Sequence, residues 1–258
     1  MPELIEVEMY RVALDATVGR SIAEAHIPDR SYPRFVGVEE VVAELVGSTI
    51  VGTSRRGKLA IAELDSGRRL GLRFGMTGRL IVDGAAPIDT LEYSSDRDDP
   101  AWDRFIIRFC DGGVLRLNDP RRFGSVELDP SLDALGPDAS TATVAEMVDA
   151  VKSDRSVKAV LLDQSRVAGL GNLLVDETLW RAAIAPTRTA RTLDHERVAH
   201  LRRVMRRTIA QLTRRGGSHR GDLHEERHAG GVCPRDGEPL LRQQVAGRTT
   251  IWCSAHQT

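Results

Sequence analysis

The sequence contains few aromatic residues, few cysteines and no long apolar run. Aromatic residues make up 4% of the 258 residues, and the three cysteines cannot all pair with one another. No apolar stretch is long enough to cross a bilayer, and Glu3, Glu6 and Glu8 stand where a signal peptide carries basic residues. These absences argue against a membrane protein or a disulfide-rich secreted protein, and they predict a cytosolic protein with reduced thiols.

The net charge of −1 hides a strongly basic segment. Between Arg188 and Arg220 there are ten arginines, and only Asp194 and Glu196 oppose them. Positive charge clustered in this way is typical of a surface that contacts nucleic-acid phosphates. It is equally typical of a solvated arginine-rich helix, and the segment alone does not distinguish the two.

Periodicity divides the chain into a β-rich part followed by a helical part. A helix is predicted over 3–18, and short apolar runs separated by glycines predict strands from about 50 to 128. Residues 111–113, Asp-Gly-Gly, mark a hairpin turn within that region. The proline, glycine and aspartate content of 129–140 is typical of a linker. Helices are predicted beyond it over 143–152, 155–163, 172–182 and 194–214, and a hairpin follows Cys233.

The stretch LLDQSRVAGLGNLLVDETLWRAAI (161–184) predicts two helices that meet at a glycine-containing turn. Gly169 and Gly171 lie in the turn, and Asn172 opens the second helix. Exposed backbone N–H groups and an asparagine amide at such a turn form a good phosphate clamp. An ordinary helical hairpin, whose glycines only permit the bend, has the same pattern.

The C-terminal segment has the spacing of a structural metal site. Cys233 and Asp236 form one pair, and Cys253 and His256 form a second pair with the same two-residue gap. Two such pairs joined by a hairpin are typical of a zinc site, usually with four cysteines. Both replacements, aspartate and histidine, can bind zinc, which favours a bound metal over a metal-free hairpin. Nearby His228 is an alternative ligand.

Two further stretches are each too weak a signal to indicate a function alone. In NDPRRFG (118–124), paired arginines precede Phe123, which could wedge between bases, although alone it fits a core position better. In MPELIEVEMY, Pro2 suits the first turn of a helix, and the glutamates suit the positive end of its macrodipole. The alternative is that Pro2 becomes the first residue and has a chemical role.

Taken together, these motifs resemble the bacterial formamidopyrimidine-DNA glycosylase/endonuclease VIII (Fpg/Nei) family of base-excision repair enzymes. The resemblance runs nearly from end to end, and it rests on MPELIEVE, RRGK (55–58), GMTGRL (75–80), NDPRRFG, LGP (135–137), DQSRVAGLGN (163–172) and VAGRTT (245–250). It implies an α+β protein that acts on damaged double-stranded DNA, works as a monomer and has no membrane partner. The implied domains are a catalytic β-sandwich at 1–130, a linker at 131–140, a helix–two-turns–helix domain at 141–222 and a zinc-finger-like hairpin at 223–258.

The resemblance also implies a mechanism. After removal of the initiator methionine, the amine of Pro2 would displace the base at C1′, form a Schiff base and let elimination cleave the strand. An α-amino group titrates near ~7.7–8.0, against ~10.4 for lysine, so a useful fraction is unprotonated at neutral pH. Glu3 would act as general acid–base, Lys58 would contact phosphate and assist elimination, and Glu177 would support the amine.

Other family positions carry over as contacts to DNA and metal. The implied gap-filling residues, which replace the everted base, are Met76, Arg121 or Arg122, and Phe123. The implied phosphate contacts are Lys158, Asn172 and Arg248. The implied ligands of a structural Zn²⁺ are Cys233, Asp236, Cys253 and His256.

Three departures from the family pattern keep other functions open. Ile5 replaces a second proline, the finger lacks two cysteines, and the stretch from Ser218 to Val232 is shorter than in members that excise 8-oxoguanine. The preferred base, an oxidised purine or an oxidised pyrimidine, therefore stays open. So does a catalytically impaired protein that binds lesions or abasic sites. A DNA-binding regulator built on the arginine-rich helices is a more remote alternative.

Overall fold

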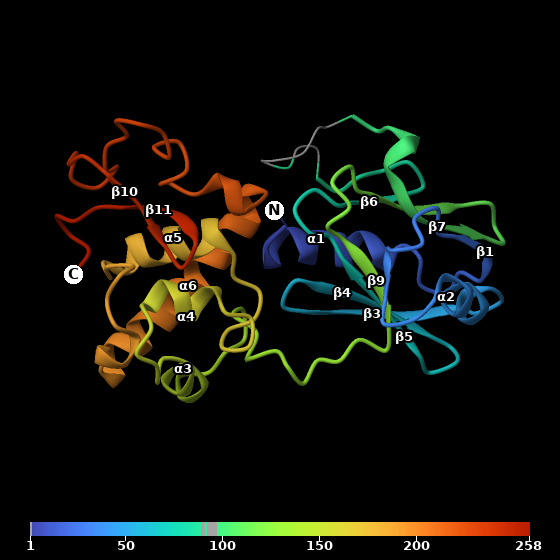
Figure 1. Ribbon diagram of the computed structural model, residues 1–258, viewed down its shortest axis with the longest axis horizontal. Coiled ribbons are helices and arrows are strands. Elements are labelled where there is room, and N and C mark those ends of the chain that lie inside the picture. Colours follow the sequence, from blue (N-terminus) through green and yellow to red (C-terminus); the bar gives the residue numbers. More distant parts are fainter. Residues whose placement is uncertain (1, 89–90, 92–96) are drawn as a thin grey trace. The chain divides into compact units, whose positions relative to one another are not determined.

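The computed structural model describes residues 2–88, 91 and 97–258, and the chain folds as two compact units (Figure 1). The first unit is Met1–Leu132 and the second is Asp133–Thr258, so the division falls inside the predicted linker. The rest of that linker packs into the second unit. Ala139 is fully buried, and its backbone N–H donates to the carbonyl oxygen of Ala168 at 2.9 Å.

The described residues of the first unit form two β-sheets. The four-stranded sheet is antiparallel throughout, and its order is β1 (Ile22–His26), β7 (Asp103–Phe109), β8 (Val114–Asn118) and β6 (Arg79–Val82). The five-stranded sheet has the order β2 (Pro33–Arg34), β9 (Ser125–Leu128), β5 (Arg69–Arg73), β4 (Leu59–Leu64) and β3 (Ile50–Arg56). Only the short β2–β9 pair of this sheet is parallel. The helices of the unit are α1 (Leu4–Asp15), α2 (Val38–Leu45) and the 3₁₀ turn η1 (Pro100–Trp102).

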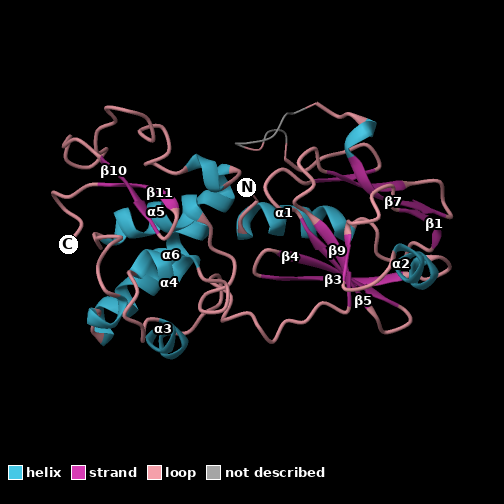
Figure 2. Ribbon diagram, in the orientation of Figure 1, coloured by secondary structure: helices cyan, strands magenta, loops and turns pink. Residues whose placement is uncertain are grey.

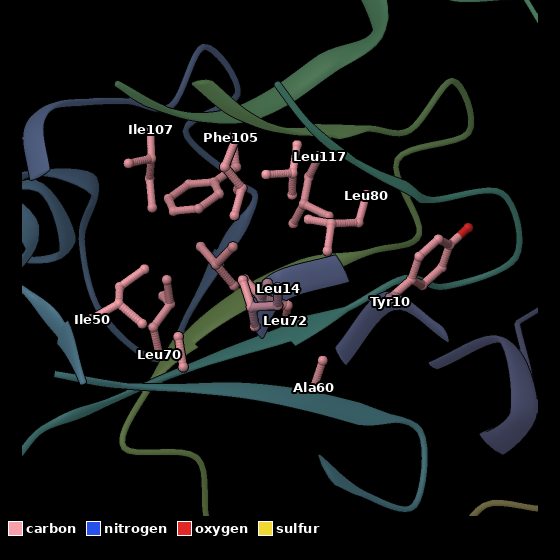
Figure 3. Packing of buried hydrophobic residues seen from close by; sticks show 14 of the residues in the cluster. Tyr10, Leu14, Ile50, Ala60, Leu70, Leu72, Leu80, Phe105, Ile107 and Leu117 are labelled. Carbon is pink, nitrogen blue, oxygen red and sulfur yellow. The ribbon is translucent and has the colours of Figure 1, made fainter. Parts of the chain in front are cut away.

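The core of the first unit lies between the two sheets (Figure 3). Phe105 and Ile107 point inward from β7, because alternate residues of a strand face the same side. Leu70 and Leu72 meet them from β5 on the opposite sheet. Helix α1 adds Leu14 to the same cluster. The predicted β-sandwich is therefore confirmed.

The second unit is mainly helical (Figure 2). Its helices are α3 (Val144–Ala150), α4 (Val157–Leu162), α5 (Asn172–Ala182), α6 (His195–Arg215) and the 3₁₀ turns η2 (Ala190–Thr192) and η3 (Ser218–Arg220). Its strands β10 (Leu241–Val245) and β11 (Arg248–Trp252) form an antiparallel hairpin. The helix–turn–helix arrangement and the C-terminal hairpin agree with the predicted α+β class.

Local sequence explains where the long helices begin and end. Asp194 caps α6 by accepting a hydrogen bond from the Arg197 backbone N–H, and Gly216 ends it with φ at +92°. The apolar side chains of α6 repeat at helical spacing and are buried, whereas α5 is buried on nearly all sides. Helix α5 is thus the centre of the second unit, and it packs against α4, α6 and β11. Within the described ranges, no helix combines the length and apolar character that a membrane crossing requires.

Candidate functional site

A pocket of about 190 Å³ opens in the first unit at the start of the chain. Its lining combines the first described residue with the tips of three other segments: Pro2, Lys58, Arg73, Phe74, Gly75 and Phe123. A proline, a lysine, an arginine and two phenylalanines therefore line one cavity. This set of groups suits an anionic ligand that also has a flat surface.

The beginning of α1 fixes Pro2 and Glu3. Glu3 is the N-terminal cap of the helix, and its backbone N–H donates to Glu6 Oε2 at 2.8 Å. Both carboxyl groups are almost completely buried, with Glu3 only 1% exposed. The predicted general acid is thus held one residue from Pro2 and shielded from bulk water. Met1, whose removal the predicted mechanism requires, lies outside the described residues.

A tyrosine docks α1 against the segment that follows β5. The Tyr10 hydroxyl donates to the Gly78 carbonyl oxygen at 3.2 Å, and its ring lies 4.3 Å from the Phe74 ring centroid. Burial raises the pKa of Tyr10 far above its ordinary value, so its hydroxyl stays a hydrogen-bond donor. This contact keeps the start of the chain beside the Phe74 wall of the pocket.

Lys58 reaches the same pocket from the β3–β4 hairpin. Gly57, with φ at +57°, forms the two-residue turn with Lys58, and positive φ at such a position favours glycine. Arg55 ties this turn to α1, because it donates to the Gly57 carbonyl at 2.7 Å and to Glu8 Oε2 at 3.0 Å. The structure therefore brings Pro2 and Lys58 to the same pocket.

The turn after β5 and the loop before β9 approach each other closely. Gly75 has φ at +54°, and a Cβ atom there would lie 2.4 Å from the carbonyl carbon of Phe123. Asp119 joins the two segments: one carboxylate oxygen accepts from Thr77 Oγ1 and the other from the Gly124 N–H, both at 2.7 Å. Met76, which follows Gly75, is partly buried. The predicted gap-filling residues Met76 and Phe123 thus project from two segments that are locked together.

The two arginines of NDPRRFG have different environments. Arg122 donates to Asp29 Oδ2 at 2.6 Å, and this guanidinium lowers the pKa of Asp29 to about 2. Arg121 instead lies over the Phe123 ring, 5.0 Å from its centroid, and Phe123 is 52% exposed. The structure therefore leaves Arg121 beside the exposed ring, while Arg122 is held in an ion pair.

Two of the three predicted phosphate contacts of the second unit meet at one backbone carbonyl, and the third is next to it in the sequence. Asn172 Nδ2 donates to the Thr249 carbonyl oxygen at 3.0 Å, and Lys158 Nζ lies 3.5 Å from the same oxygen. Arg248 is the preceding residue on the hairpin and is exposed. Helix α4, helix α5 and the C-terminal hairpin therefore present these residues from one locality.

Lys158 itself is fully buried and lies in a charged network. Its Nζ pairs with Asp176 Oδ1 at 2.5 Å, and the other oxygen of Asp176 pairs with Arg227 at 2.7 Å. Direct contact between Lys158 and a phosphate would require this network to open. In the structure, Lys158 instead fixes α4 to α5 and to the hairpin. Its role as a DNA contact stays a prediction.

Glu177 is also engaged within the second unit. Its Oε1 accepts from Arg181 at 2.6 Å and from the Asp222 N–H at 3.0 Å, and its Oε2 accepts from the Leu223 N–H at 3.0 Å. These contacts anchor the short segment that follows η3 to helix α5. Support of the Pro2 amine by Glu177 stays a prediction.

The predicted metal ligands come together at the base of the hairpin. Cys233, Asp236, Cys253 and His256 each offer one donor atom, and all four atoms lie within 4.8 Å of one another. His256 Nδ1 lies 2.7 Å from Asp236 Oδ2, and this contact holds the pKa of Asp236 well below its usual range. Burial raises the pKa of the Cys253 thiol, a shift that a bound cation would offset. Two sulfurs, a nitrogen and a carboxylate at these separations fit tetrahedral zinc. His228 is not part of the group.

Sequence patterns missed the residues that position these groups. Asp119, Asp29 and Asp176 were not among the predicted site residues, and neither was Trp180, whose indole N–H donates to Cys233 Sγ at 3.3 Å. Only Asp119 carried a local signal, because an aspartate directly before a proline favours a turn. The partners of the other three are distant in the sequence.

Comparison with known proteins assigns both units to the same family. The family model described as the formamidopyrimidine-DNA glycosylase N-terminal domain matches residues 1–126, and that described as the formamidopyrimidine-DNA glycosylase H2TH domain matches residues 133–221. A protein named formamidopyrimidine-DNA glycosylase from Rhodopseudomonas palustris (strain HaA2) is 34% identical over 294 residues, which cover 100% of both chains. One with the same name from Geobacillus kaustophilus is 35% identical and covers 98% of each chain.

Solved structures agree with this comparison. A complex of the LlFpg protein with THF-DNA and an inhibitor has a TM-score of 0.83 and 30% identity, with 100% of both chains covered. A complex of Lactococcus lactis Fpg with DNA that contains an abasic site has a TM-score of 0.82 and 29% identity, with 99% of each chain covered.

Proposed function

Because the chain belongs to the formamidopyrimidine-DNA glycosylase family, we propose that it excises oxidised bases from duplex DNA and then cleaves the abasic strand through a Schiff base at Pro2. The observation that carries this proposal is the shared pocket of Pro2, Lys58 and Phe123, with Glu3 buried beside it. A chain that had kept the fold but lost catalysis would have no need to preserve this combination.

The chemistry begins once Met1 has been removed. The secondary amine of Pro2 forms a bond to C1′ while the bond from C1′ to the base breaks, and the proton that the amine then loses goes to the departing base. Glu3 donates a proton to the sugar ring oxygen, the ring opens, and C1′ becomes an iminium carbon bonded to Pro2. A C2′ proton then passes to solvent, and its bonding electrons form a C2′–C3′ double bond as the bond from C3′ to the phosphate oxygen breaks. The ammonium group of Lys58 stabilises the negative charge of that phosphate.

The remaining elements would hold the damaged duplex. Phe123 and Met76 would occupy the space that the everted base leaves, with Arg121 beside them. Asn172 and Arg248 would contact the phosphate backbone, and the Lys158–Asp176 pair would hold their supporting elements together. These contacts carry no sequence information, as suits an enzyme that must find damage anywhere.

We also propose that Cys233, Asp236, Cys253 and His256 hold a structural Zn²⁺. Bound there, zinc would cross-link the two ends of the hairpin that carries Arg248. We place the protein in the bacterial cytosol and nucleoid as a monomer. Its three free cysteines suit a reducing compartment.

Borohydride trapping tests the catalytic proposal. Protein mixed with a duplex that contains one abasic site should give a covalent complex upon reduction, and peptide mapping should place the adduct on Pro2. Lys58→Ala should still form the adduct but cut more slowly. An adduct on another residue, or strand cleavage by protein that retains Met1, would refute the role of Pro2.

The same duplex distinguishes the other candidate functions. Tight binding to the abasic site without cleavage or trapping would identify a lesion-binding protein whose catalysis is impaired. Sequence-specific binding to undamaged duplex would identify a regulator. A panel of duplexes that each carry one oxidised purine or pyrimidine would then define the preferred base.

A further inference from the structure

Trp180 contacts two of the four clustered metal-ligand residues in three ways. Its indole Nε1–H donates to Cys233 Sγ at 3.3 Å. Its backbone carbonyl oxygen lies 3.2 Å from His256 Nε2, and its ring meets the His256 ring edge-on with centroids 6.0 Å apart. The side chain is nearly buried, and it comes from α5 rather than from the hairpin. Trp180 therefore connects the cluster to the central helix of the second unit.

Each polar contact of Trp180 favours the form of one ligand residue, His256 or Cys233, that can bind a cation. A backbone carbonyl can only accept, so it selects the His256 tautomer that carries its proton on Nε2. That tautomer leaves the Nδ1 lone pair facing Asp236 and Cys233. The indole N–H can only donate, and a hydrogen bond to sulfur stabilises a thiolate more than a thiol.

We propose that Trp180 is the positioning residue of the metal centre, which sets its affinity for the ion and attaches the hairpin to helix α5. This inference rests on the proposed occupancy of the cluster by zinc. Outer contacts of this kind orient the ligands of metal sites, and their loss typically weakens metal affinity about 10–100-fold.

The attachment extends from the metal cluster toward the proposed DNA contacts. Helix α5 carries Trp180 near its C-terminal end and Asn172 at its N-terminal end, eight residues apart along one rigid rod. Asn172 bonds to Thr249 on the same hairpin that the metal would close. The hairpin is therefore held to α5 at both ends, by Asn172 and by Trp180.

Trp180→Phe tests this inference, since it keeps an aromatic side chain and the backbone carbonyl but deletes the indole N–H. We expect zinc affinity, measured by competition with a chromophoric chelator, to fall about 10–100-fold. In cobalt-substituted protein, the thiolate-to-cobalt absorption band should shift. The matched control is Trp252→Phe, because the Trp252 Nε1 is buried with no hydrogen-bond partner among the described residues. It should bind zinc as the wild type does.

A second measurement does not depend on the folding of Trp180→Phe. With Trp102 and Trp252 both replaced by phenylalanine, Trp180 is the sole tryptophan of the full chain. Its fluorescence should change when a chelator removes zinc and return when zinc is added. Unchanged emission, or a Trp180→Phe protein whose zinc affinity lies within twofold of the wild type, would overturn the inference. So would a wild-type protein that binds no zinc.

Trapping at Pro2, assayed on the same preparations, separates these outcomes from failure of the catalytic proposal. Normal trapping together with unchanged metal affinity would overturn the role of Trp180 alone. Weakened metal affinity in Trp180→Phe would support that role even if the wild type forms no adduct at Pro2.

Discussion

The buried carboxylate of Asp119 accepts a hydrogen bond of 2.7 Å from the hydroxyl of Thr77, 42 residues earlier in the chain. Its second oxygen holds the Gly124 N–H. One side chain thus locks the turn that carries Met76 to the loop that carries Phe123. The geometry of the proposed wedge depends on this lock.

Replacing Gly75 by alanine should disrupt this lock, because the added Cβ would lie 2.4 Å from the Phe123 backbone. Gly67→Ala is the matched control, since Gly67 also has positive φ, at +84°, but nothing within 4 Å of the added atom. The free energy of unfolding of the control should fall only by the cost of a left-handed alanine, about 1–2 kcal/mol. Urea unfolding should show a larger loss of stability for Gly75→Ala than for the control. Incision of damaged duplex should fall only in Gly75→Ala. Equal losses in the two proteins would contradict the proposed close approach.

Phe123→Ala should impair activity on duplex far more than on single strands, because only a duplex has a stack that needs a wedge. Its stability should change little, since the ring is half-exposed. Phe35, 92% exposed in the same unit, provides the control, and Phe35→Ala should cut both substrates normally. Parallel losses on both substrates in Phe123→Ala would show that the ring has no wedge role.

The Asp29–Arg122 ion pair predicts a specific pH dependence. The folded pKa of Asp29, about 2, lies below the ordinary value of ~3.9, so its stabilising contribution is complete above pH ~4 and is lost as the pH falls through about 2. Asp29→Asn should therefore be less stable than the wild type near neutral pH, and the difference should shrink in acid. Urea midpoints across this range measure it. Asp133→Asn, at an exposed carboxylate, should follow the wild type throughout. Curves for Asp29→Asn that stay parallel to the wild type would exclude this effect.

Arg248→Ala should weaken binding to all duplexes alike and lower the slope of log affinity against log salt by about 0.9, the value for one phosphate contact. Arg108→Ala removes an exposed arginine from β7 of the first unit and should leave the slope unchanged. Filter binding at several salt concentrations provides the measurement. If Arg248→Ala changed only which lesion is cut, Arg248 would be a lesion contact instead.

Much of the fold followed from the sequence because strong signals act over a few residues. The hairpin around Asp111–Gly113 and the helices α5 and α6 lie close to where the patterns predicted them. Strand β1 and helix α2 were not predicted. Only Ile22 of β1 is buried, so that strand shows no clear apolar repeat. Helix α2 does carry one, since Val38, Val41, Val42 and Leu45 recur at helical spacing, but it is only 8 residues long.

For the site, motif order indicated the family and grouped the candidate residues, but it could not assign their environments. NDPRRFG did not distinguish Arg121 from Arg122. The distinction comes from Asp29, 93 positions away from Arg122. In the same way, the pattern around Lys158 gave no sign that its ammonium group is buried against Asp176.

The sequence by itself determined the α+β class, the helix–turn–helix, the ligand pairs at the C-terminus and the set of candidate catalytic residues. The first three depend on turn chemistry, periodicity and spacing, which are local, whereas the candidate catalytic residues were implied by the resemblance to the family. Only the tertiary structure decided which arginine stays beside Phe123, what holds Glu177 and Lys158, and that Trp180 touches the metal ligands. Those outcomes depend on charges and hydrogen bonds between residues that only folding brings within about 3 Å of each other.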